Sequence, residues 1–498
     1  MPAHQVKPSA ANDARKDCAT DYPDTQLFIA GVWRPASSRR SIDVIDPATD
    51  DVLGTVAQAD QADLAAAVDA ARTGFLVWSE MSAFERGKIM RNAADLLRQR
   101  AGHLSPVLTQ EQGKPLGEAM GEIMAGADII DWFAEEGRRS YGQIIPARSP
   151  SVTQLTLKLP VGPVAAFAPW NFPINQVVRK LSAALSAGCS IIIKAPDETP
   201  ASPAALVRCF EEAGVPAGAI NLVYGDAREV SSYLIADPAI CKISFTGSTM
   251  VGKQLASLAG EHMKRATMEL GGHAPVIILD DADVEKAVSI LAAAKYRNAG
   301  QVCVSPTRFL VQDGVFDAFA QKFTAFAKSI RVGNGLSPES QMGPLANMRR
   351  LSAVAAITED AVAHGAELTT GGQRIGNRGN FFEPTVLLNA PLDSAIMNDE
   401  PFGPVAVINR FSSLDEAISE ANRLPYGLAS YAFTRSAHAA QVIGRRVNAG
   451  MTSINHIGLG LPEVPFGGVR DSGYGTEGGS EAIEPYLVTK FISHLAEA

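Results

Sequence analysis

The sequence contains few cysteines, no long apolar run and no excess of positive charge, and each of these absences excludes a class of protein. The five cysteines form no C-x-x-C pair, which argues against a zinc site or a disulfide framework and favours a reducing compartment. Apolar runs such as PVAAFAPW are far shorter than the ~20 residues of a membrane span. The 44 basic and 53 acidic residues give a net charge of -9, so nucleic acid is not an expected partner. We therefore expect a cytoplasmic protein that acts on a small molecule and uses no metal, membrane or nucleic acid.

The length and the order of apolar segments predict a multidomain α/β protein. A chain of 498 residues exceeds the size at which a single hydrophobic core stops growing. Residues 1–23 mix charges without an apolar segment, so we interpret them as a disordered extension rather than a signal or transit peptide. Apolar residues at helical spacing between Asp63 and Arg100 predict a pair of amphipathic helices.

Two series of alternating apolar runs and helical stretches indicate two parallel sheets. The first series starts near Pro163 and includes SIIIKAP, INLVYG and CKISFTG, and the second begins near Gly271 with APVIIL and reaches GMTSINH. This βαβ rhythm predicts parallel strands covered by helices. Residues 141–160 and 480–498 have strand-like composition outside both series, and we interpret them as an added sheet, formed between subunits.

One cysteine lies in a segment that a buried thiol does not require. Cys303 stands in YRNAGQVCVSPTR, close to Gly300 and Gln301 and six residues after Arg297. Free cysteines usually pack in cores as small apolar residues, so this segment alone favours structural burial. A catalytic nucleophile is the alternative.

Two other polar residues stand in equally unusual surroundings. Asn171 is flanked by Trp170, Phe172 and prolines in APWNFPINQVVRK, where a side-chain amide could donate to a developing oxyanion. Glu269 follows an apolar strand in MELGGHAP and precedes two glycines, which permit close backbone approach. It is either a general base or a residue that caps the next element.

Two segments have features of a dinucleotide site. SFTGSTMVGK places Gly247 and Gly252 between an apolar strand and a helix, where a pyrophosphate can bind the helix N-terminus. Its spacing differs from G-x-G-x-x-G, so a plain strand-to-helix turn is an equal alternative. Lys194 and Asp197 follow another strand in IIIKAPDETP and can bind ribose hydroxyls, the alternative being a solvated charge pair.

These segments together carry a resemblance to a known family. PWNFP, FTGSTMVG, MELGG, GQVC, EPFGPV and PFGGVRDSGYGTEGG occur in that order, and the chain from Asp24 onward resembles the aldehyde dehydrogenase superfamily. The segments NQVVRKLSAALSAG and KAPDETPASPAAL are similar to dehydrogenases that act on succinic semialdehyde or 2-oxoglutaric semialdehyde. The resemblance implies an aldehyde dehydrogenase-like fold with two doubly wound α/β domains and a small β oligomerisation extension.

The resemblance also assigns domains and residues. It implies a dinucleotide-binding domain at 24–140 and 161–270, a catalytic domain at 271–465, oligomerisation segments at 141–160 and 480–498, and a homodimer or homotetramer. The implied catalytic residues are Cys303, Glu269, Asn171 and Lys180. The implied cofactor-binding residues are Ala168, Pro169, Trp170, Lys194, Asp197, Gly225, Phe245, Gly247, Ser248, Val251, Leu270, Glu400 and Phe402. The implied substrate-binding residues are Phe172, Arg179, Arg297 and Phe466.

The implied reaction is NAD-dependent oxidation of a small carboxylate-bearing semialdehyde to the dicarboxylate through a thioester on Cys303. Asn171 would hold the oxyanion and Glu269 would deprotonate the hydrolytic water. NADP is the less favoured cofactor, because Asp197 is acidic although one methylene shorter than the usual glutamate. A broad-specificity dehydrogenase, a coenzyme A acylating enzyme and a non-catalytic relative are the alternatives, and Glu269 argues against the coenzyme A branch.

Two departures from the family pattern affect these expectations. Ser305 occupies the position where some succinic semialdehyde enzymes carry a second cysteine, so a disulfide switch at that site is not available. The loop before PFGG offers Gly460 and Leu461 in place of a substrate-binding serine, which makes 2-oxoglutaric semialdehyde a serious candidate.

Overall fold

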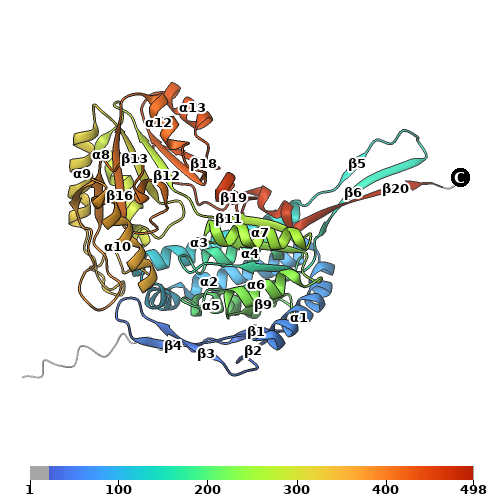
Figure 1. The fold of residues 1–498 in the computed structure, drawn as a ribbon. Helices are drawn as coiled ribbons and strands as arrows, with labels where there is room; N and C mark the ends of the chain where they lie inside the picture. Colours follow the sequence, from blue (N-terminus) through green and yellow to red (C-terminus); the bar gives the residue numbers. More distant parts are fainter. Residues whose placement is uncertain (1–21, 497–498) are drawn as a thin grey trace, which may run out of the picture.

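The computed structural model describes residues 22–496, so nearly all of the predicted extension at 1–23 lies outside the described residues. Two α/β domains lie side by side, and an antiparallel ribbon projects from them (Figure 1). Within the described residues, no helix combines the length and apolar composition that crossing a membrane requires.

The first domain is built on an eight-stranded sheet with strand order β19-β11-β10-β7-β8-β9-β1-β2. Its central strands from β11 to β9 are parallel, and β7 to β10 are buried at every position, as expected when helices cover both faces of a sheet. The strands are β1 (Leu27–Ile29), β2 (Val32–Arg34), β7 (Val164–Phe167), β8 (Ile191–Lys194), β9 (Ile220–Val223), β10 (Lys242–Thr246), β11 (Arg265–Glu269) and β19 (Gly473–Tyr474).

The predicted amphipathic helix pair at the start of this domain corresponds to α1 and α2. Each begins with a capping box, formed by Asp60 with Asp63 in α1 and by Ser82 with Glu85 in α2. Helix α2 ends at Gly113, whose φ of 97° favours glycine. The helices are α1 (Gln61–Glu80), α2 (Ala83–Gln112), α3 (Leu116–Glu136), α4 (Asn175–Ala187), α5 (Ala201–Glu212), α6 (Ala227–Ala236) and α7 (Thr249–Glu261).

The second domain is built on a seven-stranded sheet with strand order β14-β15-β16-β13-β12-β17-β18. Its neighbouring strands are parallel except for the edge strand β14, which is antiparallel to β15. The strands are β12 (Ala274–Ile278), β13 (Pro306–Gln312), β14 (Glu367–Thr370), β15 (Thr385–Leu388), β16 (Val405–Phe411), β17 (Ala429–Phe433) and β18 (Met451–Ile454).

Aromatic packing joins helix α9 to this second sheet. Phe319 and Phe323 of α9 pack on each other and on Phe309 of β13, with ring centroids 4.9 to 6.1 Å apart. The helices of this domain are α8 (Val284–Tyr296), α9 (Phe316–Ser329), α10 (Met348–Ala363), α11 (Ala395–Asn398), α12 (Leu414–Ala421) and α13 (Ala437–Arg446). The predicted α/β fold class with two sheets is confirmed.

The two strand-like segments outside both series pair with each other. β20 (Leu487–Leu495) lies antiparallel to β6 (Val152–Pro160), which pairs with β5 (Gln143–Ile145). These strands form the ribbon that projects in Figure 1. The remaining elements are the hairpin β3 (Ser41–Ile45) and β4 (Val52–Ala57) and the 3₁₀ turns η1 (Gly137–Arg139), η2 (Arg297–Gly300), η3 (Arg470–Ser472) and η4 (Ser480–Tyr486).

The topology gathers distant loops at one edge of the first sheet. Strands β7, β10 and β11 are neighbours and parallel, so the loops that follow Phe167, Thr246 and Glu269 emerge at the same edge. The C-terminal segment returns to this edge through β19, where Gly473 pairs with Glu269.

Candidate active site

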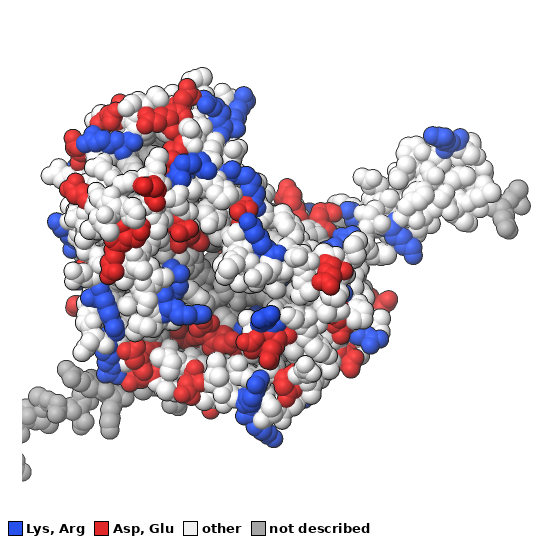
Figure 2. All heavy atoms as spheres, in the orientation of Figure 1, with Lys and Arg blue, Asp and Glu red and all other residues white. Residues whose placement is uncertain are grey.

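The loops at this edge and the Cys303 segment of the second domain line one cavity of about 640 Å³. The surface between the two domains is hollowed in Figure 2. The cavity lining includes the predicted residues Pro169, Trp170, Asn171, Gly247, Ser248, Glu269, Leu270, Cys303, Glu400 and Phe402. Both domains therefore contribute to a single candidate active site.

The backbone before Cys303 adopts a conformation that most residues avoid. Asn298 and Ala299 have φ angles of 50° and 52°, and each left-handed residue other than glycine costs about 1–2 kcal/mol. Gly300 has a φ of 73°, and a Cβ there would overlap the carbonyl oxygen of Gly403. Glycine is thus required at the position that leads into the cysteine.

Gln301 links this turn to the Asn171 loop. Its Nε2 donates to the Asn298 carbonyl at 3.0 Å, and its Oε1 accepts from the Ala346 amide at 2.9 Å. The Gln301 carbonyl accepts from Asn171 Nδ2 at 3.1 Å. Because a side-chain amide carries two N–H groups, Asn171 keeps one donor for the cavity that it lines.

The Cys303 thiol is strongly desolvated. Burial raises the pKa of Cys303 to about 12, with further increases from the carboxylates of Glu400 and Glu269, and the backbone N–H groups of Val304 and Cys303 oppose the shift. Thiolate formation at neutral pH therefore requires a proton acceptor or a positive charge near the sulfur. Cys189 and Cys209 are buried and Cys241 and Cys303 are partly buried, and of these four only Cys303 lines the cavity.

Glu269 is a buried carboxylate that faces the same cavity. It is 2% exposed, and neither of its oxygens has a hydrogen-bond partner within the described part of the chain. Burial raises its pKa well above the usual range, Glu477 raises it further, and Lys180 and Arg179 lower it. A carboxylate with free oxygens and a raised pKa can accept a proton from a group that enters the cavity.

Lys180 and Glu477 form a buried ion pair close to Glu269. Lys180 Nζ also donates to Thr246 Oγ1 at 2.6 Å, and Glu477 Oε1 accepts from Ser244 Oγ at 2.9 Å. The pair thus joins α4, β10 and the C-terminal segment. Sequence reasoning placed Glu477 within the GTEGG motif but did not assign it a role.

The N-terminus of α7 opens onto the cavity. Ser248 is its N-cap, and Thr249 and Met250 also line the cavity. Gly247 leaves space for Phe245, because a Cβ on the glycine would lie 2.5 Å from the phenyl Cζ. Val251 lies in the first turn of α7 and does not line the cavity. Free amides at this helix end favour an anion such as a pyrophosphate.

Aromatic and acidic groups from the two domains meet at the other side of the cavity. Trp170 and Phe402 pack edge to face with centroids 5.6 Å apart. Arg350 stacks on Phe402 and donates to the Pro401 carbonyl at 2.7 Å. Burial raises the pKa of Glu400 to about 8, with opposing effects from the Gly272 N–H and Arg350.

Three predicted cofactor residues form a separate polar group outside the cavity lining. Lys194 Nζ lies 2.7 Å from Asp197 Oδ2. Asp197 Oδ1 accepts from Gln58 Nε2 and from the Gly225 amide, each at 3.1 Å. The Lys194 carbonyl accepts from the amide of Ala168 at 3.2 Å, which connects this group to the loop after β7.

Arg179 is a buried cation near Glu269 and Cys303. It donates to the carbonyls of Glu477 at 2.9 Å and Gly460 at 2.7 Å, and its guanidinium lies 5.0 Å from the Phe466 ring. Burial lowers its pKa, whereas Glu477, Glu269 and Cys303 raise it. No described carboxylate forms a salt bridge with it, although its charge is shielded from water.

Arg297 lies on the other side of the Asn171 loop. Its side chain is exposed, and its guanidinium lies 5.2 Å from the Phe172 ring centroid, while Lys114 Nζ lies 4.0 Å from the same centroid. Neither Arg179 nor Arg297 lines the main cavity. The structure thus places Arg179 against Phe466 and Arg297 against Phe172, and it shows no contact between the two cations.

Sequence reasoning missed several residues of the cavity. Five of them lie within the quoted segments and Asp399 precedes EPFGPV, so the motifs could have identified these six, whereas Arg349 and Arg350 stand in a helix with no sequence signal. The missed residues are Gln176, Thr246, Thr249, Met250, Gly271, Arg349, Arg350, Asp399 and Tyr426.

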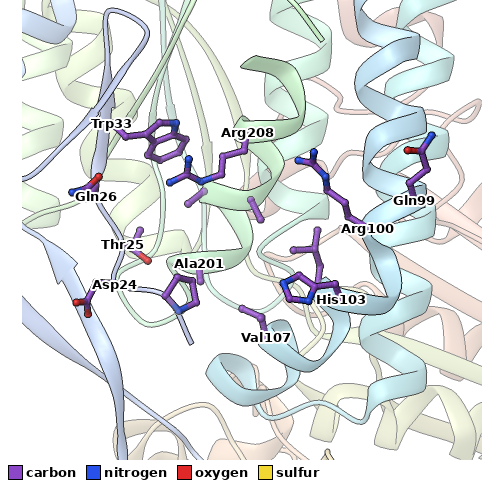
Figure 3. Close-up of a pocket in the computed structure, with 14 residues that line it drawn as sticks. Asp24, Thr25, Gln26, Trp33, Gln99, Arg100, His103, Val107, Ala201 and Arg208 are labelled. Atoms are coloured by element: carbon purple, nitrogen blue, oxygen red, sulfur yellow. The ribbon is translucent and has the colours of Figure 1, made fainter. Parts of the chain in front are cut away.

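A second pocket of about 480 Å³ lies between α2, α5 and the segment 23–26 (Figure 3). Arg208 stacks on Trp33 at 4.0 Å, and Trp33 Nε1 donates to Glu211 Oε2 at 2.7 Å. Arg100 donates to Glu212 Oε1 at 3.0 Å. Since these polar groups are paired with one another and no predicted site residue lines the pocket, we assign it no chemistry.

Comparisons with known proteins find similarity over nearly the whole chain. Residues 33–492 match the Aldehyde dehydrogenase family. A putative 4-(hydroxymethyl)benzenesulfonate dehydrogenase of Comamonas testosteroni is 45% identical over 95% of this chain and 99% of its own. The NADP(+) succinate-semialdehyde dehydrogenase GabD of Escherichia coli is 40% identical over 94% and 97%. The crystal structure of succinate-semialdehyde dehydrogenase from Burkholderia pseudomallei superposes with a TM-score of 0.93 at 40% identity, covering 95% of this chain and 98% of that chain.

The electrostatic surroundings of Glu269 predict opposite shifts of the pH profile in two variants. If ionised Glu269 is the base, kcat rises as pH increases through its pKa. Glu477→Gln removes a negative charge that raises this pKa, so the acidic limb should move to lower pH. Lys180→Met removes a positive charge that lowers the pKa of Glu269, so the acidic limb should move to higher pH. Steady-state kcat measured against pH at saturating substrates checks both signs, and shifts in the same direction would contradict this role for Glu269.

Proposed function

Because the chain belongs to the aldehyde dehydrogenase family, we propose that it oxidises a small semialdehyde carrying a carboxylate, succinic or 2-oxoglutaric semialdehyde, to the dicarboxylate with NAD. The observation that supports the substrate class is the pair of cations Arg179, which lies near Glu269 and Cys303, and Arg297, which lies over the Phe172 ring. Neither forms a salt bridge with a carboxylate among the described residues. A carboxylate on the substrate supplies the missing anion.

The cavity residues fit the chemistry of this oxidation. The Cys303 thiol loses its proton to water, its sulfur attacks the aldehyde carbon, and the free N–H of Asn171 stabilises the oxyanion that forms. A bound oxidised dinucleotide supplies the hydride acceptor. Loss of hydride leaves an acyl thioester on Cys303. Glu269 then takes a proton from water, whose oxygen attacks the thioester. The C–S bond breaks, and Glu269 returns the proton to the sulfur, which releases the carboxylic acid and restores the thiol.

The relatives support an anionic substrate but differ in the anion. Succinate semialdehyde carries a carboxylate, whereas the substrate named for the Comamonas testosteroni relative carries a sulfonate. Guanidinium groups bind either anion through charge-assisted hydrogen bonds. An aldehyde with a sulfonate group is therefore the second candidate, favoured by the 45% identity to that relative. Glu269 supports hydrolysis over transfer to coenzyme A.

The cofactor proposal depends on Asp197. Its carboxylate is fixed by Lys194, Gln58 and Gly225 at the carboxyl end of β8, where a dinucleotide-binding sheet holds the adenosine ribose. A negative charge there opposes a 2′-phosphate. The paired Lys194 offsets part of that repulsion, so we propose that NAD is favoured by a modest margin.

The substrate proposal predicts a selective effect of Arg297→Gln. This side chain is exposed, so its loss should leave the fold intact. Because a charge-assisted pair contributes about 1.5–3 kcal/mol, kcat/KM for succinic semialdehyde should fall roughly ten- to a hundredfold. The uncharged butyraldehyde should be oxidised as by the wild type. Arg228→Gln, an exposed change on α6, is the matched control.

One outcome separates the candidate substrates, and a second tests the role of Arg297. A wild-type preference for 4-formylbenzenesulfonate over both semialdehydes would favour the sulfonate candidate. Equal losses with charged and uncharged aldehydes in Arg297→Gln would refute a role for this residue in anion recognition.

Cys303→Ala should abolish turnover of every aldehyde, and retention of activity in it would overturn the mechanism.

The cofactor proposal predicts that Asp197→Asn narrows the preference for NAD. The amide keeps an acceptor for Gly225 while it removes the charge, so the ratio of kcat/KM with NAD to that with NADP should fall about tenfold, as for loss of one charged interaction. Initial rates with each dinucleotide at fixed aldehyde give the ratio. A wild-type enzyme that strongly prefers NADP would contradict the proposal directly.

We further propose that the projecting ribbon joins subunits in a homodimer or homotetramer. Ile144 and Tyr141 are 86% and 72% exposed and Phe491 is 56% exposed, and the ribbon carries few charges on the face in Figure 2. Ile144→Asp should lower the mass measured by light scattering. Leu76→Asp is the control, because Leu76 lies on α1 and is 65% exposed, and it should leave the measured mass unchanged. An unchanged mass in Ile144→Asp would count against the ribbon as the interface.

A further inference from the structure

Three charged residues outside the motifs lie between the two loops of the candidate active site. Lys114 occupies the turn between α2 and α3, and Glu118 and Glu122 lie in the first turns of α3. The two glutamates are four residues apart and so share one face of the helix. Lys114 and Glu122 have side chains that are 0% and 1% exposed. Burying charges is costly, so a role that offsets this cost is expected.

Lys114 contacts the Asn171 loop directly. Its Nζ donates to the Asn171 carbonyl at 2.9 Å and to Glu122 Oε2 at 2.6 Å, and it stacks on Phe172. The adjacent Leu116 amide donates to the Gly335 carbonyl of the second domain at 3.1 Å. The turn that carries Lys114 therefore touches both domains where they meet.

Glu122 holds the other end of that loop. Its Oε1 accepts from the amides of Ile174 at 2.9 Å and Asn175 at 3.2 Å, where α4 begins. A carboxylate at a helix N-terminus also interacts favourably with the helix dipole. Glu122 and Lys114 thus fix the residues on both sides of Phe172.

Glu118 reaches the nucleophile turn. Its Oε2 accepts from the Asn298 amide at 2.8 Å, at the first of the two left-handed residues. Asn298 Nδ2 in turn donates to the Asn171 carbonyl at 2.8 Å. The Asn171 carbonyl therefore receives donors from Lys114 and from Asn298, and the strained turn before Cys303 is tied to the Asn171 loop through α3.

We propose that Lys114, Glu118 and Glu122 are positioning residues that set the nucleophile turn and the oxyanion loop at a fixed separation. The proposal rests on the proposed function for the roles of Cys303 and Asn171. It assigns to α3 a part in catalysis without contact with substrate, because attack by sulfur and stabilisation of the oxyanion require the two loops to be aligned.

The test uses the full-length enzyme and four variants. Lys114→Met removes the donor to the Asn171 carbonyl, Glu118→Ala removes the acceptor of the Asn298 amide, and Glu118→Gln restores an acceptor without the charge. Arg34→Met is the control, since Arg34 pairs with the fully buried carboxylate of Asp63 at 2.9 Å away from the cavity. The measurements are kcat, KM for aldehyde and dinucleotide, melting temperature, and the rate of Cys303 alkylation by iodoacetamide followed by peptide mass spectrometry.

The expected results distinguish a loss of loop positioning, seen in kcat, from a loss of stability, seen in the melting temperature. Lys114→Met and Glu118→Ala should lose ten- to a hundredfold in kcat, the order of effect of a small misplacement, with unchanged KM for the dinucleotide. Their Cys303 should be alkylated faster, because a released turn exposes the thiol and lowers its pKa. Glu118→Gln should recover most of the lost kcat, and Arg34→Met should lose stability but not kcat.

Other results overturn the proposal. Normal kcat in folded Glu118→Ala and Lys114→Met would remove the positioning role, as would a loss of kcat in Arg34→Met equal to theirs. If Lys114→Met does not fold, the kcat of Glu118→Ala decides the test. Glu118 is only partly buried, so this variant should fold. Alkylation needs no aldehyde, so it reports on the loops even if the proposed substrate is wrong, whereas activity in Cys303→Ala would refute the proposed function itself.

Discussion

The candidate active site depends on the desolvation of charged groups where the two domains meet. Burial is the largest cause of the raised pKa of Cys303, Glu269 and Glu400. In such surroundings a nearby charge acts more strongly than in water, so each ionisation state depends on its neighbours. The same desolvation makes an unpaired charge costly. Most of the buried polar groups at the site therefore need hydrogen-bond or ion-pair partners.

Partners come mainly from parts of the chain that are distant in sequence. Lys180 of α4 pairs with Glu477 of the C-terminal segment, and Arg179 donates to carbonyls on two C-terminal loops. Strand β19 brings that segment back to the first sheet beside Glu269. Glu269 itself is left without a partner among the described residues. A buried carboxylate with both oxygens unpartnered is suited to accept a proton from a group that enters the cavity.

The sequence predicted the fold well and the polar network poorly, for a physical reason. Periodicity and βαβ alternation are local properties, so the two α/β domains and the helix pair before them could be identified from short windows. Motifs placed Cys303, Glu269 and Asn171, which line one cavity as the resemblance implies. The pairings of Glu477 and Glu122 could not be predicted, because hydrogen bonds between distant residues leave no periodic signal. The positions of Arg349 and Arg350 likewise follow only from the packing of α10 across the cavity.

Helix α4 carries both Arg179, the proposed anion-binding residue, and Lys180, which lies near Glu269. Arg179 and Lys180 are adjacent, so their side chains leave the helix about 100° apart, given 3.6 residues per turn. One contacts the Gly460 loop and Phe466, and the other contacts Glu477 and Thr246. The N-terminus of the same helix is held by the carboxylate of Glu122. Any movement of α4 therefore changes the contacts of Arg179 and the surroundings of Glu269 together. A substrate whose anionic group is held by Arg179 would restrain this helix, and would thereby favour the arrangement in which Glu269 accepts its proton.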